Sequence, residues 1–288
     1  MSRLNLSIAL LASLAVVSSA AASGSLVGLY HVPADVTHCD LIRIDLATGA
    51  NTTLFSDVSA CSALTTNYPS FSTQGPAGRL LVAVGSAAAV FSVDIETGTA
   101  IPLGAIANNK SDIMIGVAHW PAQNVTVVGT QYGIWNASSF LQNDLLLELS
   151  GADAFGEAFV FAGPWPTLFV VSGTSSRILL IDIEAATIKR TTGLASPIGT
   201  VLNGNALLQE KGYVLYSTPA AGGAAKRVLS IPDGPGYPRT NLLAGTDFWV
   251  VFDFAHMMVA DLKKKTIAIV GDGFVAAARG MGFPIYVP

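Results

Sequence analysis

The chain has 288 residues, with 15 Lys and Arg against 19 Asp and Glu, which gives a net charge of −4 at pH 7. Charged residues make up 12% of the chain, about half the share in an average soluble domain, and 51% of the residues are hydrophobic. Proteins that bind nucleic acid carry clustered Lys and Arg, so this composition excludes a nucleic-acid partner. The hydrophobic content is too high for an intrinsically disordered chain.

The N-terminus has the pattern of a secretory signal peptide. Arg3 precedes an apolar run over residues 8–17, and three alanines at 20–22 form a small-residue cleavage site. We predict cleavage after Ala22, so that residues 1–22 are the signal peptide and residues 23–288 form one domain; a retained membrane anchor is the alternative. Beyond residue 23 no run of about 18 apolar residues occurs, so we expect a secreted, extracellular protein without a transmembrane segment.

The two cysteines of the chain, Cys39 and Cys61, flank a predicted hairpin formed by residues 41–45 and 52–56. An even number of cysteines in a secreted chain favours a disulfide, and pairing the two strands brings both cysteines near the open end of the hairpin. A bridge of this loop length contributes about 3 kcal/mol in the chain-entropy model. Two unpaired buried thiols are the alternative.

Four N-x-S/T sequons predict N-glycosylation of a secreted protein. They lie at Asn51, Asn109, Asn124 and Asn136. If they are used, these asparagines face solvent; the alternative is that they are unmodified loop residues.

A hairpin motif recurs along the chain. It is a short β-rich strand that ends in Asp, followed by a tight turn and a second strand, and it occurs at residues 41–49, 90–98, 178–186 and 257–265. The Asp carboxylate can accept hydrogen bonds from backbone N–H groups two residues further on, and Gly permits the positive φ that such a turn requires. We place degenerate copies of the turn at residues 134–136 and 229–231.

A second strand type recurs six times, with starts about 44 residues apart on average, which is the size of a four-stranded propeller blade. Its copies are residues 25–32, 79–86, 124–131, 167–174, 212–219 and 247–254. The spacing predicts an all-β fold, a six-bladed β-propeller. Five or seven blades stay open, because the Pro- and Gly-rich segment 232–245 is compressed and one strand there is expected to be short or absent.

A third strand type begins with small residues, which suit the crowded innermost strand of a blade. Its copies are residues 115–118, 155–158, 203–206 and 279–282. Because the last copy lies at the C-terminus and the N-terminus begins with the next strand type, we predict that the two chain ends complete one shared blade and close the ring.

The Leu-x-x-Ile-Asp-x-x-Thr-Gly hairpins resemble blades of quinoprotein, lactonase and NHL-like β-propellers. A shorter stretch, residues 203–216, is similar to the Asn-Gly-hydrophobic-Ala stretch of the six-bladed gluconolactonase and strictosidine-synthase-like group. In gluconolactonases that Asn binds a divalent metal at the central channel, together with a Glu from an earlier innermost strand and an Asp from a later one.

The resemblance implies Asn203 and Glu157 as ligands of Ca²⁺ or another divalent metal such as zinc. Glu157 stands in Gly-Glu-Ala where the family has Glu-Gly-Pro, and no residue matches the family's Asp motif; Asp247 and Asp253 are merely nearby. Oxygen ligands of this kind suit Ca²⁺. The alternative is that these side chains hydrogen-bond neighbouring backbone.

Two functions remain open at the level of sequence. The first is an extracellular binding module for an unknown protein, glycan or small molecule, for which Trp165 is a candidate contact in an exposed loop while Trp120, Trp135 and Trp249 are expected between blades. The second is a metal-dependent lactone or ester hydrolase of the gluconolactonase type. A lipid-anchored surface protein is a weaker third, because Arg279 interrupts the hydrophobic tail. Whether the protein is an enzyme at all stays open.

Overall fold

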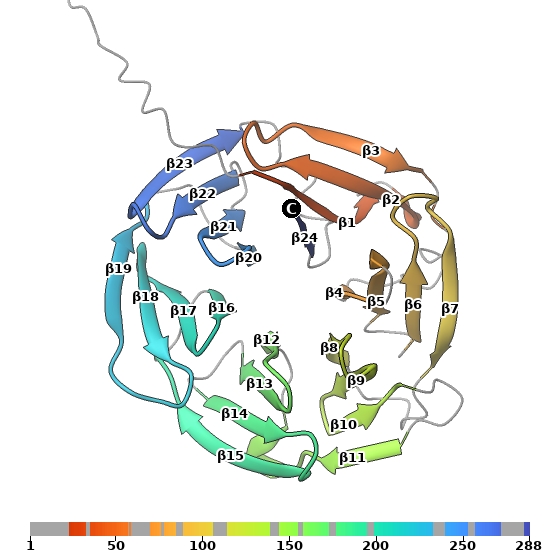
Figure 1. Cartoon of the computed structure of the whole chain (residues 1–288), viewed down its shortest axis with the longest axis vertical. Coiled ribbons are helices and arrows are strands. Elements are labelled where there is room, and N and C mark those ends of the chain that lie inside the picture. The colour runs from red at the N-terminus through yellow and green to blue at the C-terminus, as the bar shows by residue number, and fades with distance from the viewer. Residues whose placement is uncertain are drawn as a thin grey trace, which may run out of the picture.

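The computed structural model describes residues 23–32, 35–56, 58, 70–75, 78–84, 89–105, 114–138, 144–154, 158–172, 177–194, 199–232, 240–252, 257–271 and 285–288. These residues are almost entirely β-strand and form six four-stranded antiparallel sheets. The sheets are arranged as blades around a central axis (Figure 1). The protein is therefore a six-bladed β-propeller, as its repeat spacing predicts.

Strands are given from the axis outward. Blade 1 consists of β24 (Ile285–Val287), β1 (Ser25–Val32), β2 (Asp35–Asp45) and β3 (Asn51–Phe55). Blade 2 consists of β4 (Ser70–Gln74), β5 (Leu80–Val84), β6 (Ala89–Val93) and β7 (Ala100–Ala105). Blade 3 consists of β8 (Met114–Trp120), β9 (Val125–Thr130), β10 (Gly133–Asn136) and β11 (Asp144–Glu148).

Blade 4 consists of β12 (Ala158–Ala162), β13 (Thr167–Ser172), β14 (Arg177–Asp182) and β15 (Thr187–Thr192), and the 3₁₀ turn η3 (Gly151–Asp153) precedes it. Blade 5 consists of β16 (Gly199–Asn203), β17 (Ala206–Lys211), β18 (Val214–Pro219) and β19 (Lys226–Ser230). Blade 6 consists of β20 (Thr240–Ala244), β21 (Phe248–Phe252), β22 (Met257–Asp261) and β23 (Thr266–Gly271).

The hydrophobic core is divided among the spaces between neighbouring blades. Six clusters of buried side chains fill the six interfaces, and each draws its members from two adjacent blades. Strand β13 shows why the sequence reads as continuous apolar runs: Leu168 and Val170 pack toward blade 3, whereas Phe169 and Val171 pack toward blade 5. Side chains of a strand alternate between its two faces, so a strand buried on both faces must be apolar throughout.

Glycines permit close approach of the inner strands, as the small-residue pattern predicts. Gly116 and Gly129 are cross-strand partners in β8 and β9, and Phe161 of β12 lies against both. A Cβ atom on Gly116 would lie 2.3 Å from the Cβ of Phe161, and one on Gly129 would lie 2.3 Å from its Cε2. Blades 3 and 4 can pack this closely only because these two positions carry no side chain.

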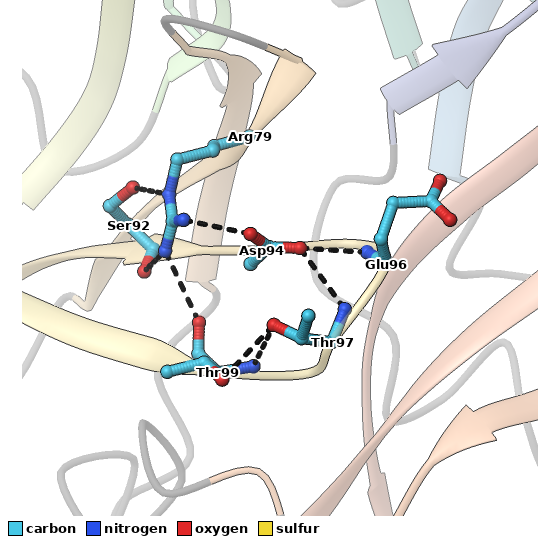
Figure 2. Close-up of polar contacts among 6 residues, drawn as sticks. All are labelled: Arg79, Ser92, Asp94, Glu96, Thr97 and Thr99. Carbon is cyan, nitrogen blue, oxygen red and sulfur yellow. Dashed lines mark hydrogen bonds and ion pairs between the residues drawn. The ribbon is translucent and has the colours of Figure 1, made fainter.

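The Asp-terminated hairpins are confirmed. The Asp94 carboxylate accepts hydrogen bonds from the N–H groups of Glu96 and Thr97 at 2.9 and 3.0 Å (Figure 2). Its other oxygen accepts a hydrogen bond from Arg79 at 2.9 Å, and Arg79 also binds the Ser92 hydroxyl at 2.6 Å. These hydrogen bonds, led by that of Glu96, hold the pKa of Asp94 below its ordinary value.

The fourth residue after each turn Asp has a positive φ. This residue is Gly49 and Gly98 in blades 1 and 2, with φ of 71° and 69°, and it is Ala186 and Lys265 in blades 4 and 6, with φ of 50° and 56°. Left-handed backbone is costly for residues with a Cβ atom, so the last two turns keep the geometry at some cost in stability.

Blade 5 corrects three details of the prediction. Residues 212–219 were expected to form the second strand, but β18 is the third strand of the blade. Residues 203–206 span the end of β16, a two-residue turn and the start of β17 rather than the start of an innermost strand. Residues 229–231 include the end of the outermost strand. The position of the turn Asp is held by Pro219, which pairs with Ala206 as Asp182 pairs with Thr167 in blade 4.

The ring closes as predicted, since β24 from the C-terminus pairs with β1 from the N-terminus in blade 1. The register joins Ser25 to Val287, and the Tyr286 hydroxyl donates to the Ser23 carbonyl at 3.1 Å. The segment in which a short or missing strand was expected contains β20, so blade 6 has its full four strands. The small residues 279–282 lie outside the described residues.

The two ends of the ring carry different kinds of connection. Because blades 2 to 6 each have four consecutive antiparallel strands, the chain enters and leaves each of these blades at the same end of the ring. We call this end, which carries the second-to-third turns and the connections between blades, the loop face. The opposite end, with the first-to-second and third-to-fourth turns, is the turn face.

Several predicted features lie outside the described residues: the signal peptide, Cys61, Asn109, Glu157, Asp253 and Arg279. Cys39 is fully buried between blades 1 and 2, and its pairing with Cys61 stays a prediction. Within the part of the chain that the structure describes, no helix has the length and apolar character needed to cross a membrane.

Candidate functional site

Two exposed tyrosines occupy equivalent places on the loop face. Tyr132 lies in the turn between β9 and β10 of blade 3, and Tyr213 lies in the turn between β17 and β18 of blade 5. Their relative exposures are 46% and 40%, and both are among the large exposed hydrophobic residues of the described chain. The ring thus presents an aromatic side chain at the same height on two blades.

The backbone fixes both tyrosines in the same way. The Tyr132 carbonyl accepts a hydrogen bond from the Leu149 N–H at 2.7 Å, and the Tyr213 carbonyl accepts one from the Ile231 N–H at 2.8 Å. In each blade the residue that follows the outermost strand is thereby tied to the second-to-third turn. Tyr213 also has φ of +61°, which is uncommon for a bulky residue and is held by the tight turn that begins at Gly212.

An ion pair anchors the connection that enters blade 4 between the two tyrosines. The Asp153 side chain in η3 is mostly buried, and both of its oxygens accept hydrogen bonds from the Arg190 guanidinium of β15, one of them at 2.7 Å. The hydrogen bonds from Arg190 are the largest cause that lowers the pKa of Asp153, and the charge of Arg177 contributes further. Such a bidentate contact fixes geometry as well as charge.

Buried polar side chains support the turn that carries Tyr213. Gln209 and Glu210 stand near the end of β17 and are each only 1% exposed. The Gln209 side-chain oxygen accepts a hydrogen bond from the Leu194 N–H at 3.1 Å, which ties β17 to the connection from blade 4. A buried carboxylate such as that of Glu210 is unusual, and groups of this kind concentrate at functional sites.

Of the two predicted metal ligands, Glu157 and Asn203, the structure describes Asn203. Asn203 is the last residue of the innermost strand β16, and its side-chain amide donates to the Thr246 carbonyl at 3.1 Å, which joins blades 5 and 6. Asp247 accepts hydrogen bonds from Lys263 at 2.7 Å and from the Thr246 hydroxyl at 3.1 Å. Its contact with Lys263 is the main cause that lowers the Asp247 pKa.

The metal prediction rests on residues of which the structure describes only a part. Among the described residues, no group of three or more His, Cys, Asp and Glu residues is placed to hold a metal ion. Glu157 lies outside these residues, so the metal site formed by Glu157 and Asn203 stays a prediction.

The tryptophans pack as expected with one exception. Trp120 and Trp249 are buried, and Trp135 packs between blades 2 and 3. Trp165, expected in an exposed loop, is half-buried against the cluster between blades 3 and 4, where its ring meets Trp120 edge-on at 5.5 Å. Because its ring contacts Trp120 and packs against this cluster, Trp165 is a packing residue rather than an exposed binding residue.

The described sequon asparagines all lie on the turn face. Asn51 follows a third-to-fourth turn, Asn124 stands in the first-to-second turn of blade 3, and Asn136 ends the third strand of that blade. Asn51 and Asn124 are exposed, whereas Asn136 is half-buried and accepts a hydrogen bond from the Ser138 N–H at 3.0 Å. Asn136 thus takes the position and the capping role of the turn Asp in its blade.

Sequence reasoning missed the residues of the loop face. Tyr132 and Tyr213 each stand next to Gly in a short polar break between two apolar strands, and an aromatic residue in such a turn is a signal that could have identified them. Asp153 and Arg190 are 37 residues apart, so no local pattern joins them.

No protein-family model and no curated protein matches the sequence. Among solved structures, a chain from the nidogen/laminin complex is similar, with a TM-score of 0.61 and 10% identity over 85% of this chain and 92% of that chain. A streptogramin B lyase gives a TM-score of 0.57 at 11% identity, over 86% of this chain and 83% of that chain.

A virginiamycin B lyase from Staphylococcus aureus is a third similar structure, with a TM-score of 0.54 and 13% identity, over 84% of this chain and 83% of that chain. At these identities the likeness shows the propeller fold alone. The gluconolactonase group that residues 203–216 resemble is not singled out by these matches.

Proposed function

We propose that the protein is a secreted binding module that engages another extracellular protein through its loop face. The observation that carries this proposal is the pair of exposed tyrosines, Tyr132 and Tyr213, at equivalent turns of blades 3 and 5. Tyrosine is enriched at protein interfaces. Its amphipathic ring offers a large contact area, and fixing its two side-chain torsions costs little conformational entropy.

The surroundings of the tyrosines favour binding because they are fixed in advance. Four contacts tie the loop-face segments of blades 3 to 5 together: Leu149 to Tyr132, Asp153 to Arg190, Leu194 to Gln209 and Ile231 to Tyr213. A surface that is already ordered loses little conformational entropy when a partner docks, and more of the contact energy remains as affinity.

Two further observations support an extracellular protein as the partner. The N-terminal pattern of residues 1–22 is that of a secretory signal peptide. One similar propeller comes from a complex of nidogen with laminin, so a ring of this shape is compatible with docking onto another protein. Fold alone does not assign function, and the loop-face tyrosines are the basis of the proposal.

The proposal is tested by binding to an array of secreted and cell-surface ectodomains. The probe is the tagged chain of residues 23–288, presented as a tetramer, together with the double variant Tyr132→Ala and Tyr213→Ala. The control is Gln123→Ala, an exposed position on the turn face of blade 3. Loss of an interface anchor costs about 2 kcal/mol, so the double variant should bind a partner at least about 30-fold more weakly.

The control variant should bind like the unmodified chain, and all three proteins should unfold at similar denaturant concentrations. An ectodomain that binds the double tyrosine variant as tightly as the unmodified chain contradicts the proposal. So does the absence of any bound ectodomain.

A metal-dependent lactone or ester hydrolase is the second candidate. The observation in its favour is the position of Asn203 on an innermost strand, as the resemblance to gluconolactonases implies. Metal analysis of the purified chain, with Glu157→Ala and Asn203→Ala beside it, separates the two candidates. A stoichiometric divalent metal that is lost in both variants supports the hydrolase, and unchanged metal content in both variants rejects it.

A further inference from the structure

The structure distinguishes two predicted glycosylation sequons by the accessibility of the hydroxyl residue that completes each of them. This inference rests on the secretory route assumed in the proposed function. Asn124 is exposed in the turn that follows Trp120, with φ of +52° and its N–H directed to the Pro121 carbonyl at 3.2 Å. Its side chain is therefore accessible, but glycosylation also requires access to the hydroxyl residue of the sequon.

The hydroxyl residue of this sequon, Thr126, is buried. Its relative exposure is 5%, and its hydroxyl lies 2.9 Å from Nδ1 of His119 on the adjacent strand β8. The Thr126 N–H donates to the hydroxyl oxygen of Ser138 at 3.0 Å, and Ser138 completes the sequon of Asn136. Ser138 itself is exposed, so the buried hydroxyl residue belongs to the Asn124 sequon.

The Asn51 sequon is arranged differently. Asn51, Thr52 and Thr53 are all exposed, at the start of β3. This strand is the outermost of blade 1, and among the described strands it pairs with β2 alone, so one of its edges faces outward. Both the acceptor amide and the hydroxyl of this sequon can be reached from solvent in the folded protein.

N-glycosylation needs the asparagine and the hydroxyl residue together, since the signal is Asn-x-Ser/Thr. The transferase forms a bond between the asparagine Nδ2 and the anomeric carbon of a lipid-linked oligosaccharide. The bond from that carbon to the lipid pyrophosphate breaks, and the amide nitrogen gives up one proton. An enzyme that must contact Thr126 can do so only when β9 is separated from β8.

We propose that Asn124 receives its glycan before blade 3 folds, whereas Asn51 is also an acceptor in the folded protein. Both glycans then project from the turn face. Tyr132 and Tyr213 lie on the opposite face, which is the surface proposed above for the partner.

The test uses chain 23–288 made in a bacterial periplasm without glycosylation, purified oligosaccharyltransferase and a lipid-linked oligosaccharide. Folded protein, urea-unfolded protein diluted into the reaction, and synthetic peptides covering residues 46–58 and 119–131 are compared, and each site is followed by glycopeptide mass spectrometry. The variants Asn51→Gln and Asn124→Gln identify the contribution of each site. Transfer to each protein site is divided by transfer to its own peptide.

We expect Asn51 of the folded protein to react at a rate close to that of its peptide. Asn124 should react at least about 100-fold more slowly than its peptide, because exposure of Thr126 requires opening of core strands, and unfolding should remove the difference. Equal relative rates at the two sites in the folded protein would overturn the proposal, as would peptides that accept no sugar. The result does not depend on any binding partner, so a failure of this proposal can be distinguished from a failure of the proposed binding function.

Discussion

The contact between blades 3 and 4 gives a stability prediction that depends on single atoms. Gly129→Ala places a methyl group 2.3 Å from Cε2 and 2.8 Å from Cζ of Phe161, and 2.9 Å from Cγ1 of Ile115. The first two atoms are at the far end of the phenyl ring and are absent from leucine. Gly116→Ala differs, because its nearest atoms are Cβ and Cγ of Phe161, at 2.3 and 2.4 Å, and leucine keeps both.

The magnitudes follow from packing and backbone terms. Overpacking a core position costs about 1–3 kcal/mol, and replacing Gly by Ala inside a strand recovers about 0.5–1 kcal/mol. A contact of 2.3 Å belongs at the upper end of the overpacking range, about 3 kcal/mol, so after a recovery of about 1 kcal/mol Gly129→Ala should lower the free energy of unfolding by about 2 kcal/mol. Phe161→Leu alone should cost about 1–2 kcal/mol from lost apolar burial. On that background Gly129→Ala should be close to neutral, a coupling of about 2 kcal/mol between the two sites.

Guanidinium chloride unfolding of the three single and two double variants measures these terms. Gly116→Ala serves as the matched control, since its cost should be the same whether phenylalanine or leucine stands at position 161. The reasoning is refuted if Gly129→Ala and Phe161→Leu add without coupling, or if Gly116→Ala is rescued equally well.

Three other predictions concern turns and charge. Ala186→Gly relieves a left-handed alanine at φ of 50° and should raise the free energy of unfolding by about 0.5–1 kcal/mol, whereas a lower value in denaturant unfolding would contradict the strain. Gly98→Ala should lower it by about 2–4 kcal/mol, because its methyl group would meet Cγ of Phe55 at 2.4 Å in addition to the backbone cost; a loss below about 1 kcal/mol in the same assay argues against the contact. The lowered pKa of Asp153 means that its pair with Arg190 stabilises the fold above the ordinary Asp pKa of 3.8 and that this contribution is lost as the pH falls below that value. Thermal midpoints measured from acidic to neutral pH should show a smaller acid-induced loss for Asp153→Asn than for the unmodified chain, and superimposable relative pH profiles would exclude the pair as a contributor.

The fold was predictable where one residue type performs one local task. Asp45 and Asp94 end a strand and cap the turn through their own carboxylates, and Gly49 and Gly98 supply the positive φ, so these hairpins are visible in the sequence. The shared blade of the two chain ends was predicted because the chain ends with the innermost strand type and begins with the strand type that follows it. Both signals are local or periodic, which is the kind of information that a single sequence carries.

Blade 5 was misassigned because its residues break those local rules. Pro219 replaces the turn Asp, so the third strand carries no marker at its end. Strand β17 contains Gln209 and Glu210, which are buried polar residues, and its apolar pattern is too short to be recognised as a strand. The burial of β17 comes from packing of Leu207 and Leu208 against the two neighbouring blades, and that packing is not local in sequence.

The loop-face site was missed for a related reason. The importance of Tyr132 and Tyr213 lies in their equivalent placement on separate blades, and that equivalence requires the correct register of blade 5. The amide of the predicted metal ligand Asn203 donates to the Thr246 carbonyl, 43 residues away in sequence, and its part in a metal site stays a prediction.

The most direct test of the binding surface is hydrogen–deuterium exchange of the chain with and without the ectodomain identified in the array. Bound partner should slow exchange in residues 130–133 and 211–214 on the loop face and leave residues 121–124 and 45–50 on the turn face unchanged. Protection confined to the turn-face segments would contradict the account.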